Sequence, residues 1–335
     1  MRSTRWTRRR LGLMAGAVVI VIAGLAAAAF ALAGSADVVV YNGRSQYGDE
    51  QAFKAFEEQT GLDVELRGGT APELFERLRR EGDATEADLL VTTDLANLWR
   101  ADDAGLLEPV ELDSNVELHD PDGAWWGIST RLRVPMRSTE RVEEDAVTTY
   151  EDLGNSDFRG RVCLRTSNNE YNQSWVADRI AKHGEADTEE LLESIMANEP
   201  RILGSDVDVL EAIAAGDCDL GLTNHYYLAR ELKEDPDFPV APAWPEGGAH
   251  TNVSGVGLVK GSEHRADAIR LMEFLTAREA QEAIVENGEF AANPDVPPAE
   301  HIRDWDGVET DPIDVEEAGP ALAAAVAMMQ RVGWE

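Results

Sequence analysis

"ADVVVYNGRSQYGDEQAFKAFEEQTGLDVELRGG", residues 36–69, decides the fold class. Residues 36–41 form a continuous apolar run, which is typical of a buried parallel strand. A helical pattern follows and ends at Gly61, and "LDVELRGG" is the next strand. The alternation continues with "APELFERLRREG", "ADLLVTTD" and "LANLWRADDAGLL". Strands that alternate with helices predict an α/β fold, and ligands of such folds bind where strands end, which here means the loops 42–49 and 92–95.

Two long extended stretches interrupt this alternation. They are "WWGISTRLRVPM" (125–136) and "HTNVSGVGLVKG" (250–261), and the strands 161–164 and 218–223 lie between them among helical patterns. We therefore predict a bilobal protein, with two parallel-rich α/β domains joined by two hinge strands. The expected domains are 36–130 plus 253–290 and 131–252 plus 291–335. A helix is also expected over "TTYEDLGN" (148–155) and another near 318–332.

The first 33 residues form a basic segment followed by an apolar one. Five arginines precede an uncharged run from Leu11 to Ala33, which ends in Ala31-Leu32-Ala33. This pattern predicts an export signal with an A-x-A cleavage site, by the general or the twin-arginine route. An uncleaved N-terminal membrane anchor is the alternative, because the run is long enough to span a bilayer. Either way the rest of the chain is expected outside the cytoplasm, in the periplasm or at the outer face of the membrane.

The composition is strongly acidic. Among 335 residues, 30 Lys+Arg face 64 Asp+Glu, a formal charge of -34. Such a surface repels nucleic acid and anionic membranes, so neither is an expected partner. We expect a soluble monomeric body. The two cysteines, Cys163 and Cys218, lie in short apolar runs, where they either form a disulfide or stay as two buried thiols.

Four of the six tyrosines follow predicted strands. Tyr226 and Tyr227 lie in "LGLTNHYYLARELK" (220–233), Tyr171 lies in "RTSNNEYNQ", and Tyr47 lies in the first loop. An adjacent aromatic pair is often ordinary core packing. If the four converge, however, their phenol oxygens make a hard, anionic site suited to iron(III).

A small anion has candidate partners beside these tyrosines. The segment 167–172 carries Ser and Asn residues at a predicted helix start, where Ser167 and Asn168 could hold an anion. Arg131, with Arg133 as the second choice, could add positive charge. The alternative is that the Asn residues only cap the helix and the arginines pair with carboxylates.

Taken in order, several segments resemble one known family. They are "VVVYNGRSQYGDEQ", "TEADLLVTTDLANLWRADDAGLL", "WWGISTRLRV", "RVCLRTSNNEYNQSWVA", "LGLTNHYYLA", "HTNVSGVGLVK" and "MMQRVGW". From about residue 37 to 335 the chain resembles the extracytoplasmic ferric-iron-binding proteins of ABC importers, in their tyrosine-rich branch.

The resemblance implies a type II periplasmic-binding-protein fold, no catalytic step, and delivery of iron(III) to an ABC permease. It implies Tyr226, Tyr227, Tyr171 and Tyr47 as metal ligands. It also implies a synergistic anion, carbonate or another, at Arg131. The first loop reads Arg44-Ser45-Gln46-Tyr47, one residue longer than the family's R-H-Y and without its histidine. Asp94 stands next to the position at which other branches use a glutamate. Closure about 128–136 and 250–258 would bring the first-domain loop onto the metal.

Two other classes of function compete with iron binding. A protein of the same fold could bind a polyamine, thiamine, phosphonate or sulfate, but such sites use aromatic boxes with acids or amide cradles. A secreted hydrolase could use Ser174 with His225 or His250, yet the chain has no G-x-S-x-G elbow and no H-E-x-x-H motif.

Overall fold

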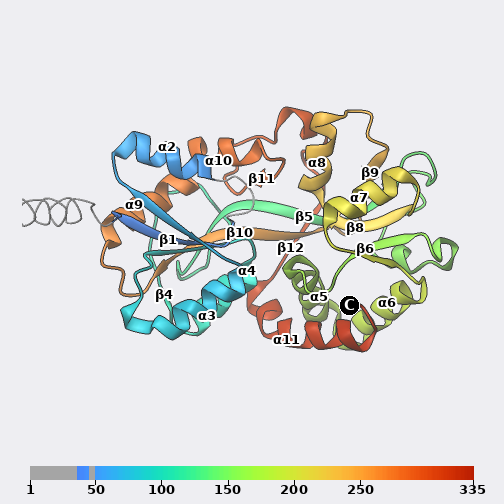
Figure 1. Ribbon diagram of the computed structural model, residues 1–335, viewed down its shortest axis with the longest axis horizontal. Helices are drawn as coiled ribbons and strands as arrows, with labels where there is room; N and C mark the ends of the chain where they lie inside the picture. The colour runs from blue at the N-terminus through green and yellow to red at the C-terminus, as the bar shows by residue number, and fades with distance from the viewer. Residues whose placement is uncertain (1–35, 45–49) are drawn as a thin grey trace, which may run out of the picture. The chain divides into compact units, whose positions relative to one another are not determined.

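One mixed sheet of 12 strands runs through the computed structural model, which describes residues 36–44 and 50–335 (Figure 1). The sheet lies within one compact unit, residues 38–335. Its main strands follow the order β2-β1-β3-β10-β5-β8-β6-β7, while β9 and β11 pair with β5, and β4 and β12 pair with β10. The strands are β1 (Val38–Asn42), β2 (Val64–Gly68), β3 (Leu89–Thr92), β4 (Leu107–Glu108), β5 (Trp126–Ser138), β6 (Val162–Arg165), β7 (Arg201–Leu203), β8 (Leu220–Asn224), β9 (Val240–Pro242), β10 (Ala249–Val259), β11 (Phe290–Ala291) and β12 (Thr310–Pro312). The α-helices are α2 (Glu50–Thr60), α3 (Ala71–Glu81), α4 (Leu95–Asp103), α5 (Glu170–His183), α6 (Glu185–Ala197), α7 (Asp206–Ala215), α8 (His225–Glu234), α9 (Arg265–Thr276), α10 (Arg278–Val285) and α11 (Val315–Arg331).

The first half of the sheet follows the predicted alternation. It consists of β1 to β4 with α2 to α4, α9 and α10. β1 pairs in parallel with both β2 and β3, so the crossover helices α2 and α3 are where the sequence predicts them. Gly61, with φ 74°, takes up the left-handed backbone that ends α2. Thr70 and Glu73 form a capping box at the start of α3.

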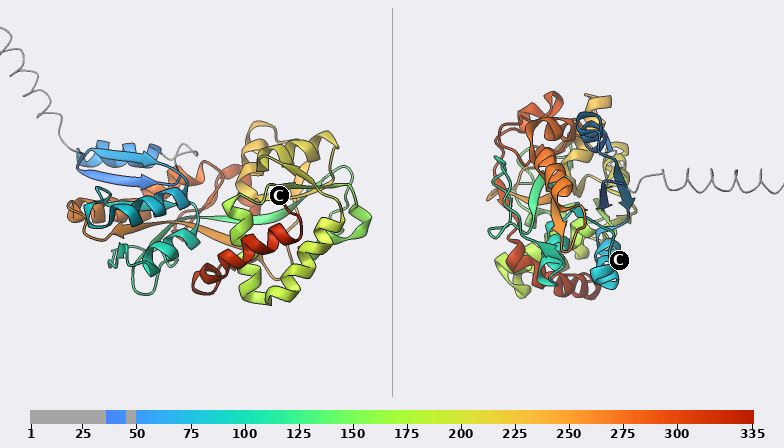
Figure 2. Two further views of the ribbon diagram at one scale, coloured as in Figure 1. Left: turned by 60° about the horizontal axis from the view of Figure 1, so that its bottom comes forward. Right: turned by 90° about the vertical axis from the view of Figure 1, so that its left-hand side faces the viewer.

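The second half, β6 to β9 with α5 to α8 and α11, repeats the pattern. β6 pairs in parallel with β7 and with β8. In Figure 2, α11 (red) lies beside the green helices of this half, where it packs against α5 and also reaches α4. Cys163 in β6 and Cys218 before β8 are joined in a disulfide, with their Cα atoms 5.9 Å apart. Of the two alternatives for the cysteines, the disulfide is confirmed.

Two antiparallel strands, β5 and β10, belong to both halves. Trp126 and Ile128 of β5 lie in the core of the first half, whereas Leu132 and Val134 lie in a core of the second. β10 runs beside β5 from His250 to Val256 and crosses the same boundary. The α/β fold with two connecting strands is confirmed, while the domain bounds 36–130 plus 253–290 and 131–252 plus 291–335 stay predictions.

The prediction of a helix over 148–155 is wrong. Glu151–Gly154 forms only a short 3-10 turn. The Asp152 carboxylate accepts from the backbone N–H groups of Thr148 and Thr149, both at 2.8 Å, and this local bonding competes with a longer helix.

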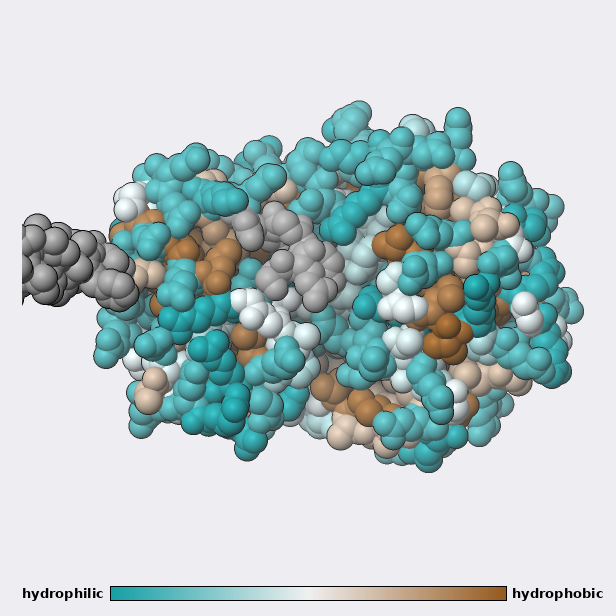
Figure 3. Space-filling view, viewed as in Figure 1, coloured by the Kyte–Doolittle hydropathy of each residue, from teal (hydrophilic) through white to brown (hydrophobic). Residues whose placement is uncertain are grey.

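The polar surface agrees with the acidic composition. Hydrophilic residues cover most of the face shown in Figure 3. The expected export signal or anchor, 1–33, lies outside the described residues. Within the part of the chain that the structure describes, no helix combines the length and apolar character needed to cross a membrane.

Candidate metal site

The tyrosine pair lies where β8 ends and α8 begins. β8 is buried along its whole length, and α8 starts at His225 directly after it. Tyr226 is fully buried and Tyr227 is half-buried, with ring centroids 4.3 Å apart. A helix turns about 100° per residue, so adjacent tyrosines in the first turn cover neighbouring sectors of one site.

Tyr171 reaches the same place from a different element. Asn169 caps α5, and its side-chain oxygen accepts from the backbone N–H groups of Tyr171 (3.1 Å) and Asn172 (3.4 Å). This cap fixes the first turn, and Tyr171 is buried. The Tyr226 hydroxyl donates to the Tyr171 hydroxyl at 3.5 Å. Two phenol oxygens that are 55 residues apart in the sequence therefore meet.

The buried phenol of Tyr171 resists ionisation. Burial raises the pKa of Tyr171 to about 12, although the charge of Arg131 works in the opposite direction. At neutral pH the hydroxyl therefore keeps its proton until a strong cation displaces it. Within residues 36–44 and 50–335, no group of three His, Cys, Asp or Glu side chains is arranged to hold a metal ion. The phenols of Tyr171 and Tyr226 meet here, so they are candidate donors.

Arg131 lies over these rings and is held by a buried carboxylate. Its guanidinium carbon is 5.5 Å from the Tyr171 ring centroid and 5.7 Å from that of Tyr226. Its nitrogens donate to the Thr93 carbonyl, to the Ser254 hydroxyl and, at 2.9 Å, to Glu289.

Glu289 also binds a second arginine. Arg44 binds it at 3.1 Å. Burial disfavours the carboxylate, but Arg131 and Arg44 outweigh burial and hold the pKa of Glu289 well below its usual range. Sequence reasoning missed Glu289, because "NGEF" carries no sign of a buried ion pair.

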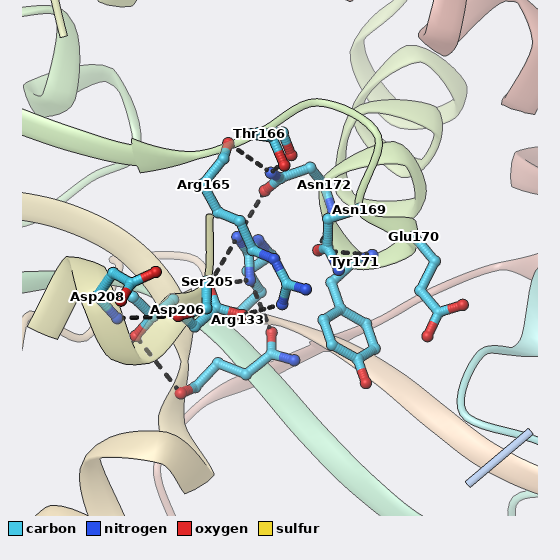
Figure 4. A network of polar contacts seen from close by, with 12 residues as sticks. Arg133, Arg165, Thr166, Asn169, Glu170, Tyr171, Asn172, Ser205, Asp206 and Asp208 are labelled. Atoms are coloured by element: carbon cyan, nitrogen blue, oxygen red, sulfur yellow. Dashed lines mark hydrogen bonds and ion pairs between the residues drawn. The ribbon is translucent and has the colours of Figure 1, made fainter. Parts of the chain in front are cut away.

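Arg133 takes part in a separate network, drawn in Figure 4. It bonds to Asp206 (3.3 Å), Asn172 (2.5 Å) and Asn224 (3.0 Å). Arg165 binds the other oxygen of Asp206 at 3.1 Å. Asp206 was also missed, because an acidic residue in the first turn of a helix is usually explained by the helix dipole alone.

Ser167, Asn168 and Tyr47 are the remaining predicted site residues. The Asn168 side chain is exposed and accepts from the Thr166 hydroxyl at 2.7 Å, and the backbone oxygen of Ser167 accepts from Gln173 at 3.1 Å. Asn169, rather than Asn168, caps α5. Tyr47 lies outside the described residues.

Direct contacts connect the two halves beside the tyrosines. The Thr93 hydroxyl donates to Glu170 at 2.6 Å. Asp94 is 1% exposed and accepts from the Ser174 hydroxyl and, at 2.6 Å, from Asn252. In this structure Asp94 therefore contacts the other half through its carboxylate. Figure 4 shows the Glu170 and Tyr171 side chains directed toward the same side.

The candidate hydrolase residues are not brought together. The Ser174 hydroxyl donates to Asp94. His225 is stacked on Phe290 and accepts from the Leu132 N–H at 3.0 Å, and burial lowers the pKa of His225 to about 4. His250 bonds to Asp178 at 2.8 Å. None of these contacts pairs a serine hydroxyl with a histidine base.

Known proteins resemble this chain over nearly its whole length. A family profile described as bacterial extracellular solute-binding protein matches residues 87–306. Iron uptake protein A1 of Synechocystis sp. is 36% identical, over 89% of this chain and 88% of its own. The Fe(3+)-binding periplasmic protein of Serratia marcescens is 25% identical, over 88% and 92%. A Trichodesmium protein, solved in complex with iron and citrate ligands, is 35% identical with a TM-score of 0.80, over 89% of this chain and 99% of its own.

Proposed function

Because the chain belongs to the family of bacterial extracellular solute-binding proteins, we propose how it handles its solute: Tyr171, Tyr226 and Tyr227 hold iron(III) between the two halves. The protein is an iron(III)-binding protein of an iron uptake system and is not an enzyme. The observation that carries the proposed site is the meeting of the Tyr226 and Tyr171 hydroxyls at 3.5 Å, next to the ring of Tyr227.

The chemistry of three phenols matches the charge of the metal. Three phenolates neutralise one iron(III), and their hard oxygens suit this ion better than softer metals. Each phenol loses a proton when the cation binds. In the metal-free site, burial raises the pKa of Tyr171, so its hydroxyl keeps its proton at neutral pH. Tyr47 is proposed as a fourth ligand, contributed by the first loop.

A small anion, carbonate or another, is proposed to complete the coordination. Its expected place is the start of α5, near Ser167 and Asn168, where backbone N–H groups favour negative charge. The positive charge of Arg131 favours an anion at this position, although Glu289 already binds the Arg131 guanidinium at 2.9 Å. Iron binding measured with and without bicarbonate tests this part of the proposal separately.

Delivery to a membrane permease is proposed to depend on closure of the two halves around the metal. A ligand can favour a closed form only through a higher affinity for that form. The contacts of Thr93 with Glu170 and of Asp94 with Ser174 lie next to Tyr171, so closure and metal binding share one place. We propose an exported monomer that an ABC permease recognises in this closed form. Export would use the N-terminal segment as a cleaved signal or as an anchor.

The test is the colour of the iron-loaded protein. Tyrosinate bound to iron(III) absorbs visible light, so the purified protein should become red or purple with ferric citrate. Tyr226→Phe should lose most of the colour, and its iron affinity should fall by more than the roughly 10- to 100-fold typical of outer partners. Tyr41→Phe is the matched control, because Tyr41 is buried but donates to Glu81 in the first half. A wild-type protein that stays colourless and retains no iron after desalting would contradict the proposal.

A further inference from the structure

A short segment, residues 286–290, leads out of α10 in the first half and lies against the tyrosine-bearing helix α8. Two basic side chains of α8 bind its backbone. Arg230 donates to the Asn287 carbonyl and Lys233 donates to the Glu286 carbonyl, both at 3.2 Å. These carbonyls follow the C-terminal end of α10, where positive charge is favourable. The segment therefore joins the first half to α8.

Gly288 makes a close approach to α8. It is buried, and its φ of 86° lies in the left-handed region that favours glycine. An added Cβ would lie 2.6 Å from the Cβ atom of Ala229 and 3.3 Å from the carbonyl oxygen of Tyr226. Carbon atoms in contact are normally about 3.5–4.0 Å apart, so 2.6 Å is a clash. A side chain at this position would push α8 and the segment apart.

The segment is fixed on its other side. Glu289 is fully buried and binds Arg131 at 2.9 Å and Arg44 at 3.1 Å. β11, which begins at Phe290, pairs with the connecting strand β5. The Phe290 ring also stacks on His225, the first residue of α8, with ring centroids 4.6 Å apart. Because the sheet and two ion pairs hold the segment, added bulk at the contact should displace α8.

A displacement of α8 would move the proposed metal ligands. Tyr226 and Tyr227 lie in its first turn. Arg230 contacts both rings, with its guanidinium carbon 4.9 Å from the ring centroid of Tyr226 and 5.8 Å from that of Tyr227. The same arginine binds the segment at Asn287, so the rings and the segment are held together. A binding site needs its groups within about 0.5 Å of the productive geometry, so a small shift here matters.

We propose that Gly288 is a positioning residue for the iron site. Because it carries no side chain, α8 lies directly against the segment 286–290, and this contact sets where the Tyr226 and Tyr227 oxygens meet the metal. The inference rests on the proposed iron site. A glycine needed only for folding would affect stability, whereas a positioning residue also changes the properties of the bound iron.

Gly261 provides a matched control. Its φ is 81°, close to that of Gly288. Among the described residues, apart from its chain neighbours, no atom lies within 4 Å of the Cβ that alanine would add there. Gly261→Ala therefore imposes the same kind of backbone strain as Gly288→Ala but without the clash.

The two alanine variants are compared as purified, iron-loaded proteins. In Gly288→Ala the displaced phenolates should donate less to iron(III), so the charge-transfer band should move to longer wavelength and weaken per bound iron. Its iron affinity should be about tenfold lower in competition with citrate, within the range for outer partners of a metal site. A loss of stability alone would not move the band. Gly261→Ala should match the wild type in band and affinity.

A compensating substitution tests the contact itself. Adding Ala229→Gly to Gly288→Ala removes the atom that the new Cβ would meet at 2.6 Å. The double variant should recover most of the wild-type band and affinity, although glycine inside a helix lowers its stability. A double variant without any recovery would contradict the role of this contact.

The outcomes separate this proposal from the function on which it rests. A colourless wild type contradicts the iron site itself, and the role of Gly288 with it. A coloured wild type overturns only the role of Gly288 if Gly288→Ala keeps its band and an affinity within twofold, or if Gly261→Ala shifts equally. If Gly288→Ala does not fold, Ala229→Val decides, because it enlarges the same contact from α8. An unchanged band and affinity in that variant overturn the proposal.

Discussion

At the scale of single residues, two buried carboxylates hold arginines near the tyrosines in ion pairs. Glu289 binds Arg44 and Arg131, and Asp206 binds Arg133 and Arg165. Each of these buried carboxylates thus binds two guanidinium groups.

Glu289→Gln tests how much one of these carboxylates stabilises the fold. The substitution removes the buried negative charge that pairs with Arg44 and Arg131, so the metal-free protein should lose about 3–5 kcal/mol of unfolding free energy at neutral pH. Urea unfolding measures this loss. Glu286→Gln is the control, because Glu286 is exposed and its carboxylate pairs with exposed Lys233 at 3.4 Å.

The stability difference between wild type and Glu289→Gln should also depend on pH. The pKa of Glu289 is lowered in the folded protein, so its contribution is fully present above the unfolded value of about 4.3. It is lost as the pH falls toward the folded value. The stability difference between wild type and Glu289→Gln should therefore narrow below about pH 4, and a difference that widens there would contradict this assignment.

Residue types and their spacing predicted the tyrosines but not their neighbours. Tyr226, Tyr227 and Tyr171 each follow a strand, so their convergence at one sheet edge could be expected from the α/β pattern. Glu289 is 158 residues from Arg131 in the sequence, and no local pattern indicates such a pairing. Only tertiary packing shows which of the 64 acidic residues are buried.

At the scale of elements, local signals predicted most helices and strands. α3 begins at a capping box and α2 ends at a glycine with positive φ, both of which are visible in the sequence. The turn at 151–154 was mistaken for a helix because the helical spacing does not reveal that the Asp152 side chain binds the backbone. Pairing of the cysteines required the register of β6 with β8, in which Cys163 lies opposite Gly221.

Removal of the disulfide should destabilise the second half. Cys163 and Cys218 close a loop with a sequence separation of 55, which corresponds to about 4 kcal/mol of chain entropy. Urea unfolding of the Cys163→Ser/Cys218→Ser protein should show a loss of this order. The colour of the iron-loaded variant should remain, because neither cysteine belongs to the site. A loss under 1 kcal/mol would show that the cross-link contributes little.

At the scale of the whole described chain, β5 and β10 connect the two halves, and polar contacts beside the tyrosines join them again. The alternation of strands and helices along the chain and the two connecting strands could be predicted, because both follow from runs of local sequence. The order of the strands in the sheet could not. The contacts of Asp94 with Ser174 and of Thr93 with Glu170 could not, because they join loops and helices from opposite halves.

Ser174→Ala tests whether these contacts support the iron-binding form. The variant removes one hydrogen bond to the buried Asp94 carboxylate, an interaction worth about 1.5 kcal/mol or more. Iron affinity should therefore fall about tenfold, while the charge-transfer band keeps its wavelength. Ser194→Ala is the control, because the Ser194 hydroxyl donates within its own helix, to the Leu191 carbonyl at 2.7 Å. Equal affinities in the two variants would argue against a role in closure.

The central claim is that tyrosine oxygens hold iron(III), and the position of the metal tests it most directly. A crystal of the iron-loaded protein, measured at the iron absorption edge, gives an anomalous difference peak at the metal. We predict one strong peak within coordination distance of the hydroxyl oxygens of Tyr171, Tyr226 and Tyr227. A peak elsewhere, or iron bound without contact to Tyr226 and Tyr227, would contradict the claim.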